Sequence, residues 1–215
     1  LRDLAEYLHG IHISSETTVE DAVVKDDFIR ARVSGVIKQA RQVGVTRFDV
    51  DGVATVEMAI AMEGGFADAV MPQTGFGVVV PTPAPVVPEA PVLNPTPAPV
   101  PNGVTGLIVD ARGLNLVSAM VPKVLDAEGR VVYGPELVDR AAAVQNGGLV
   151  GYEKDLESAK QNDRVGEAPM VVKGMEGEGT YQANVAVSQA DAERIREAVK
   201  GRTFLNQCRV VIVVD

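Results

Sequence analysis

The strongest constraint in this sequence is a run of prolines. Residues 81–101 read PTPAPVVPEAPVLNPTPAPVP and contain nine of the 13 prolines of the 215-residue chain. Proline lacks a backbone N–H and fixes φ, and it restrains the preceding residue to an extended conformation. We therefore expect a semi-rigid polyproline II spacer, although it could also pack along one domain or bind an SH3-like partner. The spacer separates predicted domains at residues 1–80 and 103–215, with the linker at 81–102.

The residues before the spacer predict an opening helix, one strand and a long hairpin. The helix follows from leucines at helical spacing, and the strands follow from alternating segments rich in β-branched residues. Asp51-Gly52 is a strong signal for the hairpin turn. The expected segments are a helix at 1–8, a strand at 11–19 and paired strands at 36–48 and 53–62. Residues 28–35 fit either a short helix or the start of a strand.

The residues after the spacer predict further strands and helices. The expected strands are 105–111, 121–126, 130–133, 169–173, 181–187 and 210–214, and the last is apolar throughout, as in a central strand buried on both faces. The expected helices are 135–144, 152–160 and one that starts at the capping box Ser188 to Asp191 and ends at Gly201. The predicted fold class is therefore α+β. It has two small domains, each a mainly antiparallel sheet with one face covered by helices.

The composition argues against several classes of protein. The formal net charge is −9, and neither half of the chain is basic, so nucleic acid is not an expected partner. No run of roughly 18 apolar residues is present to span a bilayer. Motifs typical of nucleotide-binding, zinc-dependent, thiol–disulfide and serine-hydrolase sites are missing. The two histidines, His9 and His12, have no evident third ligand, so we expect no metal, no cofactor and no catalytic residue.

Three residues are candidates for ligand or interface contacts. Asp110 and Arg112 stand at the end of a predicted strand, where a charged pair can line a cleft or anchor an interface. The same pair can equally form a structural salt bridge. Tyr152 follows a glycine-rich segment of the kind often shaped for close backbone contact.

The single cysteine, Cys208, cannot form an internal disulfide. It precedes the apolar residues Val210 to Val214. We therefore expect it to be a small core or strand-edge residue, with a reactive thiol or an intermolecular bridge as the alternative.

The N-terminal region resembles a family of bacterial envelope lipoproteins. The resemblance rests on LRDLAEYLHGIHISSETTVEDAVVKDDFIRARVSGVIKQARQV and FDVDGVATVEMAIAM, and it covers roughly residues 1–65. That family includes small outer-membrane surface lipoproteins, the flagellar basal-disk lipoprotein and the N-terminal module of a flagellar assembly protein. The segments TGLIVDARGLNLVSAMVPKVLDAEGRVVYG and NQCRVVIVVD look like the C-terminal region of longer proteins of this group.

The resemblance implies an exported protein of the periplasm or outer membrane. It implies a lipid-anchored cysteine upstream of residue 1. The helical spacing of Leu1, Leu4, Tyr7 and Leu8 separately indicates a chain that opens inside a helix, as in a trimmed fragment. It also implies assembly into envelope or flagellum-associated structures, through copies of the chain or other envelope proteins. The spacer and the second domain depart from the small members of the family, and no catalytic residue is carried over.

Three hypotheses follow for the function. The first is a non-enzymatic, structural or assembly protein of the cell envelope that self-associates through residues 1–65. The second is a periplasmic binding module, in which residues 103–215 recognise a small molecule, glycan or peptide near Asp110, Arg112 and Tyr152. The third, an enzyme, would need titratable groups with shifted pKa values gathered in a cleft, and the sequence does not indicate such a cluster.

Overall fold

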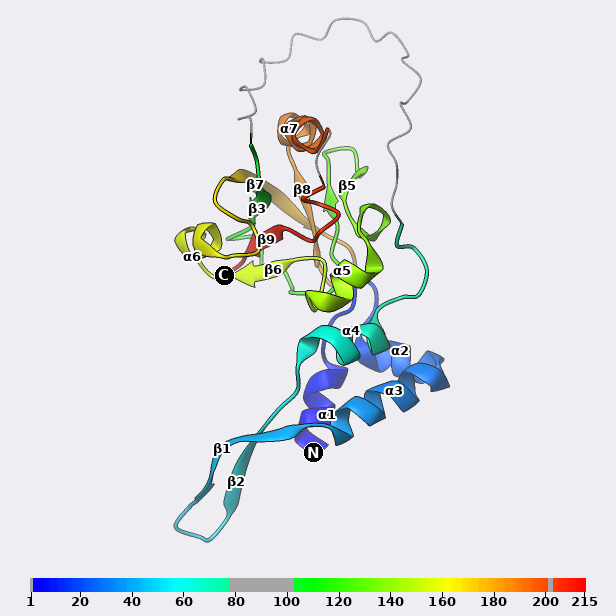
Figure 1. Ribbon diagram of the computed structural model, residues 1–215, viewed down its shortest axis with the longest axis vertical. Helices are drawn as coiled ribbons and strands as arrows, with labels where there is room; N and C mark the ends of the chain where they lie inside the picture. Colours follow the sequence, from blue (N-terminus) through cyan, green and yellow to red (C-terminus); the bar gives the residue numbers. More distant parts are fainter. Residues whose placement is uncertain (1, 78–102, 201–202) are drawn as a thin grey trace, which may run out of the picture.

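The computed structural model describes residues 2–77, 103–200 and 203–215. They form two lobes that pack on each other (Figure 1). Residues 2–77 make the N-terminal lobe, a group of short helices from which a hairpin projects. The residues from 103 onward make the C-terminal lobe, which contains the larger sheet. The α+β class is confirmed, whereas the expected spacer at 81–101 and the expected helix end at Gly201 lie outside the described residues.

Side-chain caps determine where two helices of the N-terminal lobe begin. These elements are α1 (Arg2–His9), α2 (Val19–Lys25), α3 (Asp27–Lys38), the irregular turn η1 (Met62–Phe66) and α4 (Ala67–Val70). Thr18 and Asp21 form a capping box at the start of α2. Asp26 accepts hydrogen bonds from the N–H groups of Phe28 and Ile29 and so begins α3.

Two predictions for this lobe need correction. Residues 11–19 do not form a strand, because the capping box already starts a helix at Val19 and the preceding backbone is irregular. That backbone instead bonds to the other lobe. Residues 28–35 belong to α3, which continues to Lys38, so the strand predicted at 36–48 begins only at Arg41.

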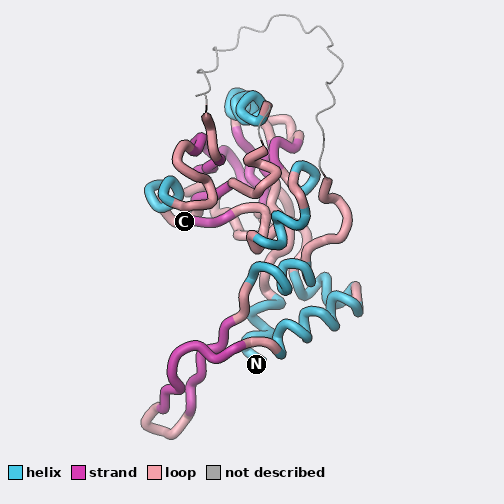
Figure 2. The backbone as a smooth tube through the Cα atoms, in the orientation of Figure 1, coloured by secondary structure: helices cyan, strands magenta, loops and turns pink. Residues whose placement is uncertain are grey.

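The predicted hairpin is confirmed. Strand β1 (Arg41–Phe48) pairs antiparallel with β2 (Ala54–Ala59). The carboxylate of Asp49 closes the turn by accepting hydrogen bonds from the N–H groups of Asp51 and Val53. Most of the hairpin residues are exposed, and the hairpin projects away from the helices (Figure 2). The expectation that helices cover one face of this sheet is therefore wrong.

The C-terminal lobe contains a seven-stranded sheet of order β5-β4-β8-β7-β3-β9-β6. Its strands are β3 (Gly106–Asp110), β4 (Val124–Leu125), β5 (Val131–Tyr133), β6 (Gly151–Glu153), β7 (Pro169–Glu178), β8 (Asn184–Val187) and β9 (Val210–Val213). The pairs β4–β5 and β7–β8 are antiparallel. The pairs β3–β7, β3–β9, β4–β8 and β6–β9 are parallel. The sheet is thus mixed and not mainly antiparallel, because helices and loops carry the chain back between strands.

Several predicted boundaries in this lobe shift. The helix predicted at 135–144 is divided into the 3₁₀ turn η2 (Pro135–Leu137) and α5 (Arg140–Gln145), which Asp139 caps. The helix predicted at 152–160 starts later, as α6 (Leu156–Gln161), because Asp155 is its cap and Tyr152 lies on β6. The glycine- and glutamate-rich segment after Lys173 continues β7 to Glu178, since β8 pairs with it. The helix after Ser188 is confirmed as α7 (Gln189–Val199).

The two faces of the sheet bury different cores. On one face, Leu156 and Ala159 of α6 pack with Ile108, Val211 and neighbouring apolar residues. On the other face, Leu107, Val109 and Ile212 belong to a large core that includes α7 and runs into the N-terminal lobe. Strand β9 is buried at every position, as its apolar sequence predicts.

A buried carboxylate ties the β4–β5 hairpin to α7. Asp126 is 1% exposed and accepts hydrogen bonds from Arg196 and Arg130 and from the N–H groups of Glu128 and Arg130. Burial alone would raise the pKa of Asp126, but these donors outweigh it and hold that pKa well below its usual range.

We predict that Asp126→Asn lowers the free energy of unfolding by about 3 kcal/mol at pH 7. The low end of the range for broken buried ion pairs applies, because both arginines reach water. Since the folded pKa of Asp126 lies below the unfolded value, its contribution is complete above about pH 4 and is lost as pH falls further. Urea unfolding from pH 7 to pH 3 should therefore show the difference between wild type and variant shrinking in acid.

The matched control is Asp27→Asn, which removes an ion pair with Arg30 at a carboxylate that is 91% exposed. That change should cost less than about 0.5 kcal/mol. Equal losses for the two variants would contradict a special role for Asp126.

Candidate functional site

Backbone hydrogen bonds join the two lobes along a seam, which we define as residues 12–15 against residues 119–121 and 179–184. The N–H groups of Met120 and Val121 donate to the carbonyl oxygens of His12 and Ile13, at 3.0 and 2.7 Å. Tyr181 donates its N–H to the carbonyl of Ser15 at 2.9 Å. The backbone carbonyls of His12, Ile13 and Ser15 therefore find their hydrogen-bond donors in the other lobe.

Two buried polar side chains lock the seam. Asn184 donates from Nδ2 to the Oγ of Ser15 at 2.7 Å, and its Oδ1 accepts from the N–H of Lys123 at 2.9 Å. Both Ser15 and Asn184 are buried. An unpaired buried amide is costly, so these bonds fix how the lobes sit on each other.

Glycine allows the closest approach between the lobes. Gly179 has a φ of +89°, and a Cβ built on it would lie 2.6 Å from Oγ of Ser15 and closer still to its Cβ. Gly147 similarly admits the backbone of Glu63, whose nitrogen would lie 3.3 Å from an added Cβ. The glycine-rich segment before Tyr152 thus serves lobe packing in part.

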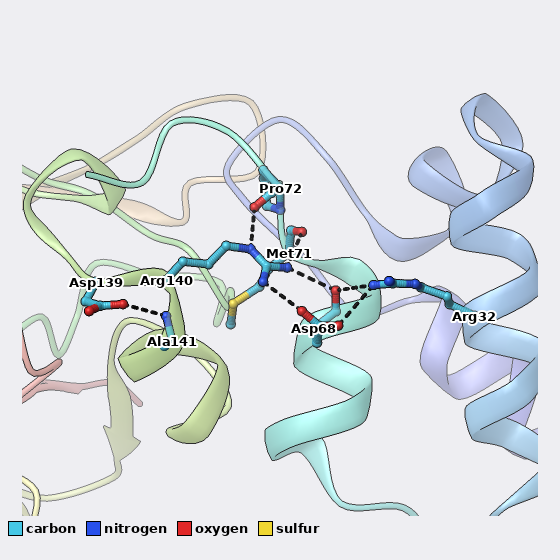
Figure 3. A network of polar contacts seen from close by, with 7 residues as sticks. All are labelled: Arg32, Asp68, Met71, Pro72, Asp139, Arg140 and Ala141. Atoms are coloured by element: carbon cyan, nitrogen blue, oxygen red, sulfur yellow. Dashed lines mark hydrogen bonds and ion pairs between the residues drawn. The ribbon is translucent and has the colours of Figure 1, made fainter. Parts of the chain in front are cut away.

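A charged bridge forms the second contact between the lobes (Figure 3). Asp68 of α4 accepts hydrogen bonds from Arg140 of α5 at 2.7 Å and from Arg32 of α3 at 3.0 Å. Arg140 also donates to the carbonyl oxygens of Asp68 and Pro72. The hydrogen bond from Arg140 is the main reason that the pKa of Asp68 is lowered.

The structure separates the three candidate residues. Asp110 and Arg112 form a two-point ion pair, with Nε and Nη2 donating at 2.8 and 2.7 Å, and this pair holds the pKa of Asp110 down. Tyr152 lies on β6, and its hydroxyl both accepts from the N–H of Ala119 and donates to its carbonyl oxygen, each at 2.9 Å. Burial raises the pKa of Tyr152.

Tyr152 lines a cavity between the lobes, of about 230 Å³. The other lining residues come from both lobes and are mostly apolar; they are Ile11, His12, Met62, Ser118, Ala119, Met120, Gly147 and Val150. Neither Asp110 nor Arg112 reaches this cavity. The three candidate residues therefore do not form one site, although Tyr152 lines a cavity.

Cys208 lies in the core, as predicted, and is fully buried. Burial raises the pKa of the Cys208 thiol, which keeps it protonated and a poor nucleophile. Beside it, burial also raises the pKa of Tyr133, whose hydroxyl donates to the carbonyl of Leu149. Arg164 donates to the carbonyl oxygens of Gly148 and Cys208, both at 2.6 Å. These contacts brace neighbouring loops in a packed interior.

The most exposed apolar surface lies on the β1–β2 hairpin. Val45 and Phe48 expose 78% and 71% of their area, and Val43, Val50, Val53 and Val56 are also exposed. In the described part of the chain, the hairpin forms a sheet of its own, so each strand has one unpaired edge. Exposed apolar residues beside free strand edges are typical of sites where protein chains associate. This hairpin is therefore the candidate interaction site.

In the described residues, no group of three or more histidine, cysteine or carboxylate side chains is placed to hold a metal ion. Within residues 2–77, 103–200 and 203–215, no helix has the length and hydropathy needed to cross a bilayer.

The fold and these surfaces define an α+β protein with a projecting hairpin and a mixed-sheet lobe. Residues 106–215 match the family described as Treponema pallidum Tp0624, second domain. Because the match spans half of the chain, the protein belongs to this family. No curated protein matches the chain.

The contacts of the seam are not predictable from the sequence. Ser15 lies in the segment predicted as a strand at 11–19, Gly179 lies between the strands predicted at 169–173 and 181–187, and nothing in the sequence indicates that they meet. Asp51-Gly52 predicts the hairpin itself, but it does not predict that the hairpin stands apart from the helices. The polar pattern of the hairpin, with Arg41, Arg47 and Glu57 among exposed valines, is the one hint that helices would leave it uncovered.

We predict that Gly179→Ala lowers the free energy of unfolding by about 3 kcal/mol, the sum of a conformational cost and an overpacking cost. The added methyl group meets Ser15, and alanine at positive φ costs roughly 1–2 kcal/mol by itself. Gly129→Ala is the matched control, since Gly129 also has positive φ but has open space around its Cβ position. Urea unfolding should give the control only the conformational cost, and equal effects in the two variants would show that the seam tolerates the methyl group.

Proposed function

We propose that this protein is a non-enzymatic structural or assembly component of the bacterial cell envelope. In this role it contacts copies of itself or other envelope proteins through the β1–β2 hairpin. The single observation that carries the assembly role is the hairpin, which presents exposed apolar side chains and unpaired strand edges away from the body. The envelope location rests on the resemblance of residues 1–65 to envelope lipoproteins, and so do a lipid anchor and a flagellar association.

The shape of the molecule supports this role. The two lobes share one core and a hydrogen-bonded seam, so the hairpin projects from a rigid body. Two-stranded sheets are only marginally stable alone in water. A hairpin that extends from the body therefore gains most when another surface covers it.

The chemistry of the titratable groups agrees with a non-enzymatic role. The groups with the largest pKa shifts are Asp126, Tyr133 and Tyr152. Each is engaged by structural partners. Tyr152 lines the cavity, and its hydroxyl there is hydrogen-bonded to the backbone of Ala119. Their pKa shifts follow from burial and ion pairing in the framework.

The test is the association state of the full chain. We expect light scattering to show concentration-dependent association, and Phe48→Ser to weaken it about tenfold by removing an exposed ring on the hairpin. Tyr7→Ser is the matched control, because Tyr7 is similarly exposed at 73% but belongs to α1 and not to the hairpin. Its association should match wild type.

The opposite results would contradict the proposal. A strict monomer at high concentration, with no envelope protein crosslinked to the hairpin in the producing cell, would remove the assembly role. Fractionation of the producing cell tests the location separately, since the natural protein should be found with the envelope.

The cavity beside Tyr152 supports a second candidate function, a binding module for a small, mostly apolar molecule. We predict that indole, used as the probe, raises the melting temperature of the wild-type protein. Ser118→Phe should abolish this shift, because Ser118 is an exposed lining residue whose enlargement fills the cavity without disturbing the core. Glu128→Phe, at an exposed site outside the cavity, is the control. Indole and other small aromatic probes that give no shift would remove this candidate.

A further inference from the structure

The two edges of the hairpin differ in how well they can accept another strand. Strand β1 contains a bulge, since Gly44, Val45 and Thr46 stand between Val43 and Arg47 where only Val56 stands in β2. It also carries two arginines, Arg41 and Arg47. Bulges and basic residues are the usual means by which proteins block an exposed edge. Strand β2 has neither, so its free edge is the open one.

The residues of β2 alternate regularly between two faces. Ala54, Val56 and Met58 share one face, and Thr55 and Glu57 share the other, because side chains alternate along a strand. The register with β1 places Phe48 beside Ala54 on the apolar face. On the opposite face, Arg47 pairs with Glu57 at 3.8 Å.

This pattern is complementary to itself when two copies of β2 run antiparallel. With Val56 opposite Val56 of the second copy, Ala54 lies opposite Met58 and Thr55 lies opposite Glu57. A small side chain then meets a large one, two β-branched side chains meet on the axis, and a hydroxyl faces a carboxylate. Such cross-strand pairs stabilise sheets.

Other registers are poorer. Moving the axis to Glu57 places two carboxylates directly opposite each other, which is destabilising. Moving it to Thr55 leaves Met58 unpaired. A shift by one residue mixes the apolar face with the polar one. Only the axis at Val56 pairs every residue from Ala54 to Met58 within the strand and keeps the faces matched.

We propose that β2 pairs antiparallel with β2 of a second copy across a two-fold axis at Val56, giving a four-stranded sheet of order β1-β2-β2-β1. The proposal rests on the assembly role proposed above and names the partner as a copy of this chain. The joined apolar face carries Phe48, Ala54, Val56 and Met58 from each copy. Four strands supply the sheet that two strands alone lack.

Disulfide trapping tests this geometry in the full chain. Directly opposed residues of antiparallel strands have Cα atoms about 4.5–5.5 Å apart, within the range of a disulfide. Val56→Cys should therefore form a covalent dimer under mild oxidation, while Cys208 stays buried and unreactive. Thr55→Cys and Glu57→Cys should not crosslink to themselves, but an equimolar mixture of the two should give the mixed dimer.

A charge placed on the axis tests the same contact without oxidation. Val56→Lys puts two ammonium groups opposite each other and should weaken dimerisation at least tenfold in analytical ultracentrifugation. Val45→Lys is the matched control on the exposed, bulged strand and should dimerise like wild type. Circular dichroism of each variant confirms that it is folded.

The outcomes separate this geometry from the assembly role. If wild type associates but Val56→Cys fails to crosslink, or crosslinks instead with Val43→Cys on β1, the two-fold pairing is wrong and the assembly role stands. If the wild-type chain neither associates nor crosslinks to an envelope protein, both are wrong.

Discussion

The relative position of the lobes depends on backbone groups of residues 12–15 that have hydrogen-bond partners in the other lobe. The carbonyls of His12, Ile13 and Ser15 accept N–H groups of Met120, Val121 and Tyr181. Burying such groups without partners costs free energy comparable to a lost hydrogen bond each. The seam therefore specifies one arrangement of the lobes, and the Asp68 bridge adds a second, charged contact in a more exposed place.

Because the two lobes form one fixed body, the hairpin that projects from it is held in one direction. The exposed surface of a mobile loop would pay a large ordering cost on association, whereas a hairpin held at its base pays less. The base of the hairpin leads directly into α3 on one side and η1 on the other, so its direction follows from helices that pack in the shared core. The unequal edges of β1 and β2 then limit which strand can accept a partner.

Local chemistry in the sequence predicts much of the fold. Asp51-Gly52 identifies the hairpin, Ser188 begins α7, and the apolar run at Val210 identifies a central strand. Residues whose partners are distant in sequence were not predictable in the same way. Strand β6 is an example, because only three residues pair with β9, and the acidic residues after Tyr152 resemble a helix.

The candidate site shows the same division. The ion pair of Asp110 and Arg112 is a local feature, because the two residues are neighbours at a strand end. Ser15 of the seam and Ile11 and His12 of the cavity lie more than a hundred residues in sequence from the segments of the C-terminal lobe that they meet, and no local pattern encodes their meeting. Sheet order has the same cause, since parallel pairing depends on crossovers and not on adjacent turns.

The chain between residues 77 and 103 connects surfaces that are already docked. A covalent connection of this kind makes docking intramolecular, which raises the effective concentration of each lobe near the other. A seam of modest strength is then enough to keep the lobes together, because a lobe that dissociates cannot diffuse away. Damage to the seam should produce brief opening followed by rapid return, so that the protein keeps a single average shape while becoming more accessible to proteases.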